Sequence, residues 1–485
     1  MQYQPALEKR NSRPADDVSA PARAELSDAE SAASSRSGFR YERFSWPALI
    51  VSLALAYACA TGPFRAPDEP HHFFRAYEVS EGHLVAAKPG GGFVGDWLPH
   101  SLDRTVLMLG GYPFVPPVRV DRAAMAKAWT VKLKSHRNFV PFPGAALHSP
   151  LAYLPAALGI TFGKMGHARP LILFYLARCA NAIVGGGLIG LALARIWRRA
   201  PYIATIALFP MCLFQVGSLT SDAVTFAISF FWVSEVLRAR TEAGFRLSRV
   251  RWILIAAALS QLRFPFPFLG LLVFAVPSHS IDQHRAARWR FFPIFFAALV
   301  LPCLLWIYFV QGLRVQLRPD GVVDPGQQLQ FIVSHPLQFF HIFGASLHQF
   351  GYDFWRQMIG VFGWLNLPLP TWLLGAVTLA LVVTICSAET RVLRLTLPIR
   401  SAFFSLGTCI LMLTATIIYM AWNSVGAPRI EGWQGRYAIP VLPLLATALA
   451  NERLRRARWL WQGAIAFSVL ANVFAIIFLA RATWS

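Results

Sequence analysis

Long apolar runs recur along almost the whole chain, and they constrain the fold more than any other feature of the sequence. Of the 485 residues, 55% are apolar and 14% are charged, whereas a soluble domain carries roughly 25% charged residues. We therefore predict an all-α integral membrane protein, a multi-helix bundle whose immediate partner is the lipid bilayer. The runs predict about eleven spans, at about 46–63, 171–194, 202–218, 222–238, 251–263, 264–278, 291–311, 371–387, 401–421, 437–450 and 459–480.

The basic residues indicate how the chain crosses the membrane. A net charge of +21 would suit a nucleic-acid-binding protein, but its location argues against nucleic acid as a partner. The polar segment 1–44 has balanced charge and is predicted to be a disordered cytoplasmic tail. The excess lies in short arginine-rich loops between apolar runs, where positive charge marks the cytoplasmic side. These loops lie near 195–199, 238–251, 285–290, 391–400 and 453–458.

With the tail in the cytoplasm, residues 45–482 form one membrane domain with two large loops on the outer side. These extracytoplasmic loops are 64–170 and 312–370. The apolar stretch 149–163 falls within the first loop and is short for a crossing. We predict an interfacial or re-entrant helix there, lying on the outer face.

An acidic pair between two prolines follows the first apolar run, in the sequence Pro67-Asp68-Glu69-Pro70-His71-His72. Pro70 suits the first turn of a helix that ends near Glu81, so one carboxylate could simply cap that helix. Ionisable groups at membrane depth are nevertheless usually functional. We predict that Asp68 or Glu69 is the catalytic carboxylate, and that the other holds the loop or a cation. Mg²⁺ or Mn²⁺ would be bound if both acids faced the site. His71, His72 and Arg75 are predicted to position substrate.

A second motif, Gly432-Trp433-Gln434-Gly435-Arg436-Tyr437, opens a late apolar run from the outer side. The Arg436 fork suits a phosphate group, although an arginine in an aromatic belt can also snorkel to the membrane surface. The flanking glycines indicate close backbone approach, which favours a ligand. Gln434 and Tyr437 belong to the same candidate substrate site. Three more charged residues, each either a substrate contact or part of a structural ion pair, are Arg178, Asp222 and Arg263.

The motifs together resemble a bacterial family of uncharacterised polytopic membrane proteins, domain of unknown function 2142. The resemblance rests on the acidic pair with its prolines, on His148-Ser149-Pro150-Leu151, on Phe362-Gly363-Trp364-Leu365 and on Gln434-Gly435-Arg436-Tyr437. It implies a bacterial inner membrane protein. A wider resemblance links the pattern to GT-C-fold glycosyltransferases such as protein O-mannosyltransferases, which also carry an acidic pair in the first outer loop.

The wider resemblance implies a GT-C-like bundle and a specific reaction. A sugar would pass from a polyprenyl-phosphate-linked donor to a glycan, lipid or protein acceptor on the outer face, with Asp68 or Glu69 as base or metal ligand. The sequence departs from those enzymes in the proline that follows the acids and in the missing outer C-terminal domain. Two alternatives stay open: a transporter or flippase for a lipid-linked saccharide, and a non-catalytic subunit of a cell-envelope polysaccharide assembly.

Overall fold

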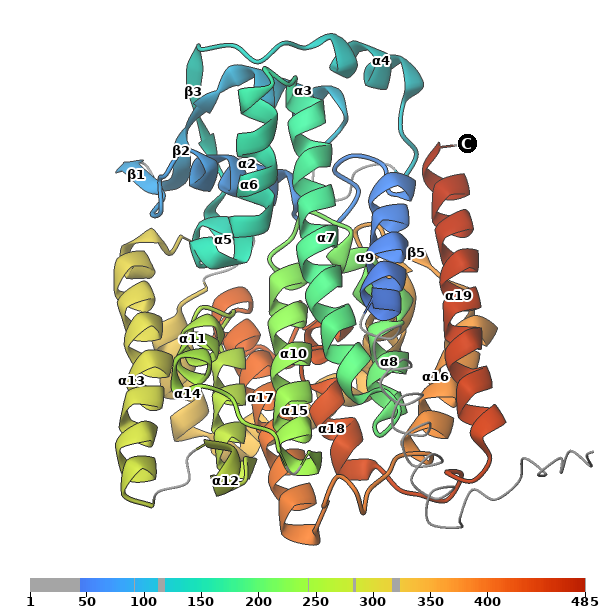
Figure 1. The fold of residues 1–485 in the computed structure, drawn as a ribbon. Coiled ribbons are helices and arrows are strands. Elements are labelled where there is room, and N and C mark those ends of the chain that lie inside the picture. The colour runs from blue at the N-terminus through green and yellow to red at the C-terminus, as the bar shows by residue number, and fades with distance from the viewer. Residues whose placement is uncertain are drawn as a thin grey trace, which may run out of the picture.

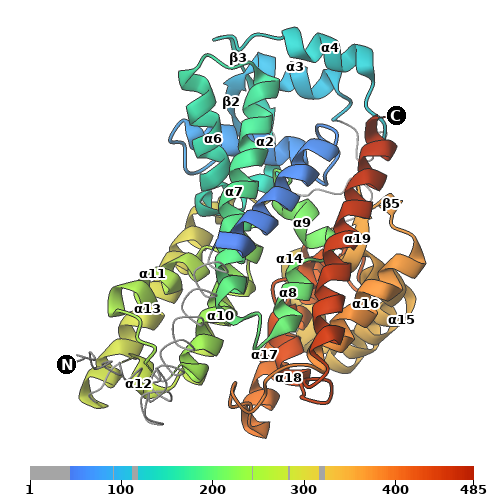
Figure 2. The ribbon, with the colours of Figure 1, turned by 45° about the vertical axis from the view of Figure 1, so that its right-hand side comes forward.

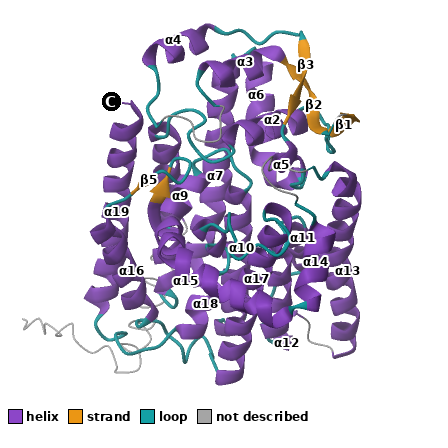
Figure 3. Ribbon diagram, turned by 180° about the vertical axis from the view of Figure 1, so that it is seen from behind, coloured by secondary structure: helices purple, strands orange, loops and turns teal. Residues whose placement is uncertain are grey.

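The structure is a computed structural model that describes residues 44–90, 92–111, 118–242, 244–281, 285–315 and 323–484. The predicted cytoplasmic tail, 1–44, lies outside these residues except for its last one. Two parts are evident in Figure 1: a bundle of long helices, and a layer of short helices and strands that covers one end of the bundle. Helix dominates both parts, and the strands of the larger sheet are confined to the covering layer (Figure 3).

The covering layer is built from the first predicted outer loop. The chain enters it from the first helix, Phe44–Ala60. Strands β1, β2 and β3 form an antiparallel sheet in that order, with Trp97 opposite Phe139. Apolar side chains of the sheet and of α2 pack into a separate core under the layer. Its elements are α2 (Glu69–Ser80), β1 (Ala87–Gly90), β2 (Phe93–Pro99), α3 (His100–Met108), α4 (Arg122–Thr130), β3 (Arg137–Pro141), α5 (Pro143–Ala146), η1 (Pro150–Tyr153) and α6 (Leu154–Met165).

The rest of the chain forms the bundle (Figure 2). Its elements are α7 (Pro170–Ile196), α8 (Pro201–Ala207), α9 (Pro210–Val216), α10 (Asp222–Thr241), α11 (Arg249–Ser260), η2 (Phe266–Ala275), α12 (Ser278–Ile281), α13 (Arg285–Val310), η3 (Gln311–Leu313), α14 (Pro325–Ser334), α15 (Pro336–Gly360), β4 (Val361–Phe362), β5 (Leu367–Pro368), α16 (Thr371–Ile385), α17 (Leu397–Trp422), η4 (Gly435–Ala438), α18 (Leu442–Leu449) and α19 (Arg458–Trp484).

Among the described residues, four helices are long and apolar enough to cross a membrane: α7, α13 with η3 from Arg290 to Leu313, α17 and α19. This agrees with an all-α, multi-pass membrane protein, whereas the predicted count of about eleven spans is not confirmed. The predicted span 202–218 is broken into α8 and α9 of seven residues each. Proline causes the break, because Pro210 has no amide hydrogen to continue the helical ladder. The predicted span 437–450 likewise contains the eight-residue α18, which begins just before Pro443.

Helix α6 lies largely within the stretch predicted to be an interfacial or re-entrant helix. After a short connection, α7 runs back beside α6, and the two helices stand side by side in Figures 1 and 2. Small residues allow this close packing, since a side chain on Gly159 would lie 2.6 Å from the Leu176 carbonyl oxygen. The outward side of α6 is an exposed apolar stripe that includes Leu158 and Phe162.

The first helix and the last helix both secure the covering layer. The first helix packs closely on α7, since a side chain on Gly190 would lie 2.3 Å from Pro47 Cα. At the other end of the chain, the Val120 amide donates to the Thr483 carbonyl oxygen at 2.8 Å, and the Thr483 hydroxyl donates to the Ala60 carbonyl oxygen at 2.8 Å. The end of α19 is therefore tied to the segments on either side of the acidic pair.

Candidate active site

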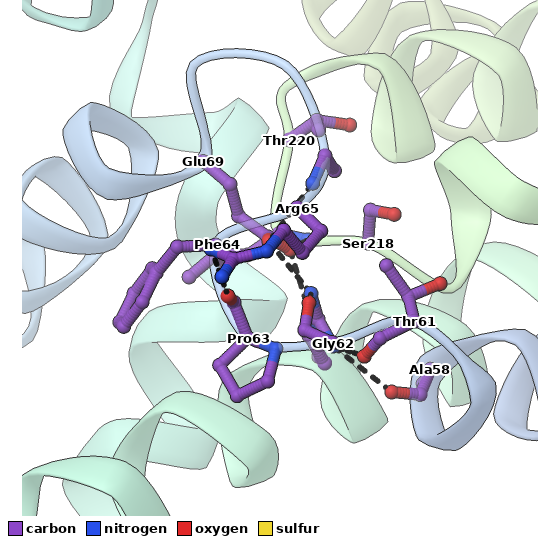
Figure 4. A network of polar contacts seen from close by, with 12 residues as sticks. Ala58, Thr61, Gly62, Pro63, Phe64, Arg65, Glu69, Ser218 and Thr220 are labelled. Carbon is purple, nitrogen blue, oxygen red and sulfur yellow. Dashed lines mark hydrogen bonds and ion pairs between the residues drawn. The ribbon is translucent and has the colours of Figure 1, made fainter. Parts of the chain in front are cut away.

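The two adjacent carboxylates of the acidic pair have different environments. Glu69 is fully buried and forms an ion pair with the fully buried Arg178, at 2.6 Å from Oε2 to Nη2. Its other oxygen accepts from Arg178 Nε at 2.8 Å and from the Leu219 amide at 2.9 Å. Figure 4 shows Glu69 within this network, beside the chain that leaves the first helix. The remaining Arg178 hydrogens go to the carbonyl oxygens of Ala58, Thr61 and Gly62. Both charged groups are thus committed to holding the loop.

Asp68 is held differently. It occupies the N-cap position of α2, but its side chain makes no capping hydrogen bond. Its backbone is left-handed, with φ 58°, a conformation that costs most residues free energy and that Asp and Asn tolerate best. The side chain is half-buried. The alternative in which the first acid caps the helix is therefore wrong for Asp68, because its carboxylate does not bond to the first turn of α2.

Charged residues from three distant segments meet around Asp68. Arg436, only 5% exposed, lies 3.5 Å from Asp222 between Nε and Oδ2. Both the Asp222 and Asp68 carboxylates lie close enough to act on the Arg436 charge. Arg263 and Arg436 also share one aromatic ring, with their guanidinium carbons 4.4 and 5.4 Å from the centroid of Tyr437. The structure thus brings together five of the predicted site residues.

Two buried polar atoms in this region have unmet hydrogen-bonding capacity. Arg436 Nε and Gln434 Oε1 have no hydrogen-bond partner among the described residues. A buried polar group without a partner costs about 1–3 kcal/mol, so such groups usually mark a place where something else binds. A bound anion would satisfy the guanidinium, and a hydroxyl-bearing ligand would satisfy the amide oxygen.

Neutral imidazoles complete the lining. His72 Nδ1 lies 2.7 Å from the Tyr153 hydroxyl, and the His72 and His148 rings are 6.0 Å apart. Burial is the main cause that holds the pKa of His72 well below its usual value, and the positive charge of Arg436 adds to it. Burial and the nearby Arg263 lower the pKa of His148 to about 3. Burial also lowers the pKa of His71, although Asp68 opposes that shift. These side chains can therefore hydrogen-bond hydroxyl groups without adding charge.

Arg75 lies behind this lining instead of within it. It is fully buried, pairs with Glu78 and donates to the carbonyl oxygens of Leu84 at 2.7 Å and His148 at 3.4 Å. Its guanidinium also packs on the ring of Trp306, 5.9 Å from the centroid. Burial, opposed by Arg75, raises the pKa of Glu78 to about 7. The predicted substrate contact of Arg75 is therefore replaced by a role in fixing the segment that carries His148.

The described residues contain no group of three or more His, Cys, Asp and Glu side chains able to hold a metal ion. The idea of a cation shared by both acids required Glu69 to face the site. The Glu69 oxygens instead face Arg178 and backbone amides, so the acidic pair does not form a two-carboxylate metal site.

The structure adds residues that the sequence did not single out as site residues. Ser149 donates to Gln261 Oε1 at 2.6 Å, which links the segment carrying His148 to the turn carrying Arg263. Tyr153 orients His72. The sequence motif that begins at His148 contains Ser149 and lies next to Tyr153, but nothing in it indicated which side chains face Asp68.

The close backbone approach predicted at the glycines of the second motif is present at Gly435, but the neighbour is helix α15 and not a ligand. A side chain on Gly435 would lie 1.9 Å from the Phe354 carbonyl oxygen and 2.5 Å from the Met358 nitrogen. The backbone of α15 occupies that space, so the glycine serves helix packing and not ligand access. Arg436 is presented to the site because η4 rests directly on α15.

The fold and the site define a multi-pass helical membrane protein with a polar site between its covering layer and its bundle. Residues 51–445 match the family described as "Predicted membrane protein (DUF2142)". The chain belongs to this family, as the resemblance implied. Comparison with curated proteins and with solved structures finds no significant match.

Proposed function

We propose that this protein is a GT-C-type glycosyltransferase of the bacterial inner membrane that uses a polyprenyl-phosphate-linked sugar. One observation carries the proposal. Glu69 is committed to Arg178, while Asp68 makes no capping bond and lies close enough to act on the charge of Arg436. A half-buried carboxylate beside a pair of arginines is an arrangement that suits proton removal next to a departing phosphate.

In the proposed reaction, an acceptor hydroxyl attacks the anomeric carbon of the donor sugar. The new glycosidic bond forms as the bond between that carbon and the phosphate oxygen breaks. Asp68 takes the hydroxyl proton, which is general-base work typically worth about 10²–10⁴-fold in rate. The leaving polyprenyl phosphate keeps the bonding electron pair and its negative charge.

Arg436 and Arg263 are the proposed phosphate ligands. The guanidinium carbons of Arg263 and Arg436 lie 4.4 and 5.4 Å from the centroid of Tyr437. Arg436 Nε is ion-paired with Asp222 at 3.5 Å but makes no hydrogen bond with the described residues. The arrangement of neutral His72 and His148 supports a role in binding sugar hydroxyl groups. Arg178 is left out of this assignment because its hydrogens are already used by Glu69 and by backbone carbonyls.

The proposed orientation places the covering layer and the site outside the cytoplasmic membrane and the N-terminus inside. The distribution of charge supports it. Exposed arginines gather at the end of the bundle away from the layer, among them Arg198, Arg251 and Arg458. Arginine-rich loops of this kind are retained on the cytoplasmic side.

The test compares Asp68→Asn with Asp103→Asn, a half-buried aspartate on α3 of the covering layer. Purified full-length protein in proteoliposomes would be given a polyprenyl-phosphate-linked hexose labelled in the sugar, with water as the acceptor hydroxyl, so that sugar release measures cleavage of the bond to phosphate. Asn tolerates the left-handed backbone at position 68, so the variant should fold and bind the labelled lipid. We expect sugar release to fall at least about 100-fold in Asp68→Asn and to be unchanged in Asp103→Asn.

A companion variant, Arg436→Lys, keeps the charge and loses the two-pronged fork, so lipid binding should weaken by about tenfold. Undiminished sugar release in Asp68→Asn would refute the proposed base. Translocation of the lipid-linked hexose across the bilayer, unaffected by Asp68→Asn, would favour the flippase alternative, since moving a lipid requires no base.

A further inference from the structure

A pocket lined by charged and apolar side chains lies at the end of the bundle away from the acidic pair. Its volume is about 800 Å³, and it forms where α7 and α10 end and α11 begins. Helix α10 has Asp222 of the candidate site at its first residue and Arg238 of the pocket in its last turn. A helix of 20 residues is about 30 Å long, which is the thickness of a bilayer core.

Positive charge dominates the pocket lining. Four arginines face two glutamates, which leaves a net charge of two positive: Arg195, Arg238, Arg246, Arg251, Glu235 and Glu242. Arg246 and Arg251 are both exposed. The pocket is therefore suited to an anion of one or two charges that approaches from solvent or from the membrane surface.

The inner arginines are held in place before any ligand arrives. Glu235 is buried and accepts from Arg195 at 2.7 Å and from Arg238 at 2.9 Å. Arg238 also pairs with Glu242 at 3.0 Å. The guanidinium groups are thus fixed by a common carboxylate, which reduces the conformational entropy that binding an anion would otherwise cost.

Apolar side chains share the pocket lining with the arginines. Phe231 lies against Arg195 and Phe245 against Arg238, at 5.5 and 4.9 Å from the guanidinium carbon to the ring centroid, and Leu254 also contributes to the lining. Leu254 is 62% exposed and the neighbouring Val250 is 64% exposed. A soluble anion would leave these apolar side chains uncovered, whereas a molecule with a charged head and an apolar chain would cover both the arginines and the apolar side chains.

We propose that this pocket binds the phosphate headgroup of an anionic phospholipid from the cytoplasmic leaflet, with an acyl chain lying along Leu254. Basic pockets between membrane helices on this side of a bilayer commonly receive such headgroups. The inference does not depend on the proposed glycosyl transfer, because none of the pocket residues belongs to the Asp68 site. It would make the lipid a bound component that ties α7, α10 and α11 together.

The test measures binding of phosphatidylglycerol to the full-length protein in detergent, with phosphatidylcholine and glycerol 3-phosphate as comparison probes. The double variant Arg246→Gln/Arg251→Gln removes the exposed pair of arginines. Each arginine near a membrane surface contributes about 1 kcal/mol, so affinity for phosphatidylglycerol should fall roughly thirtyfold. The control is Arg458→Gln, an exposed arginine at the start of α19 outside the pocket lining, which should bind as the parent protein does.

Each other outcome counts against the proposal. Equal affinity of the parent protein for phosphatidylglycerol and phosphatidylcholine would show that the pocket does not select an anion. An equal loss in the control variant would mean that diffuse surface charge, and not the pocket, attracts the lipid. Glycerol 3-phosphate binding as tightly as phosphatidylglycerol would assign the pocket to a soluble phosphate. A third variant, Leu254→Gln, should weaken lipid binding and leave glycerol 3-phosphate binding unchanged.

Discussion

Replacing Glu69 by Gln should destabilise the protein far more than replacing its neighbour Asp68 by Asn. The change keeps the shape of the Glu69 side chain and removes its charge. Arg178 would then be left as a fully buried cation, since its remaining contacts are to uncharged carbonyl oxygens. The glutamine amide nitrogen would also face a donor, either on Arg178 or on the Leu219 amide.

The expected magnitude follows from the burial of both partners. Removing one member of a buried ion pair costs about 3–5 kcal/mol, because the other charge is left uncompensated. Asp68 is half-buried and makes no capping bond, so Asp68→Asn should change the free energy of unfolding by less than about 0.5 kcal/mol. A surface comparison is provided by Glu81, whose partner Arg137 is 39% exposed. Breaking that pair with Glu81→Gln should cost about 0–1 kcal/mol.

The measurement is a reversible denaturant titration of the three variants in mixed micelles, followed by tryptophan fluorescence. A loss in Glu69→Gln no larger than that in Glu81→Gln would refute the structural role assigned to the buried pair. If such a stable Glu69→Gln variant also lost sugar release, the catalytic role would have to move from Asp68 to Glu69.

Three further predictions concern packing, pH and topology. Gly435→Ala should lower the free energy of unfolding by about 1–3 kcal/mol, because the new methyl group meets the backbone of α15. The control is Gly463→Ala, which has open space around it and should be neutral or slightly stabilising. Thermal unfolding compares the two variants. The pKa of His148 is about 3 in the folded protein and about 6.5 in the unfolded chain. The unfolded state therefore binds more protons between these pH values, and the protein loses stability as the pH falls below about 6.5. His148→Asn should flatten that part of the curve of stability against pH, and an unchanged slope would contradict the burial argument. Cysteine introduced at the exposed Arg104 should react with an impermeant reagent added outside intact cells, whereas cysteine at Arg198 should not, and the reverse labelling would invert the proposed orientation.

The sequence predicts the membrane class well, for physical reasons, and several of its candidate site residues lie near one another in the structure. Apolar runs such as those of α7 and α19 report directly on burial in lipid, and the structure has apolar helices there. An acidic pair at the end of an apolar run costs free energy if it contacts lipid, so its presence there indicates a functional site. Helix continuity was harder to predict, because hydropathy ignores the missing amide hydrogen at Pro210 and so joins α8 to α9.

The division of labour between the two acids could not be predicted from the local sequence. It depends on Arg178, which lies 109 residues after Glu69, and on the left-handed turn at Asp68. The close approach at Gly435 was predicted correctly, but its neighbour, α15, could not be identified without the fold. His148 stood in a recognisable motif, yet its place beside His72 depends on the packing of α2 against η1 and α6.

The partners of Glu69 lie far from it in the sequence, and this separation limits when its contacts can form during synthesis. At a synthesis rate of about 5–20 residues per second, Arg178 emerges about 5–20 s after Glu69, from which it is separated by 109 residues. The Leu219 amide, 150 residues from Glu69, comes later still, and the Thr483 carbonyl that pairs with Val120 is synthesised after both. The Glu69 contacts therefore cannot be complete before α7 and the turn after α9 have been synthesised. The hydrogen bond between Val120 and Thr483 cannot form before α19 has been synthesised, so the covering layer acquires its full set of contacts with the bundle late in synthesis.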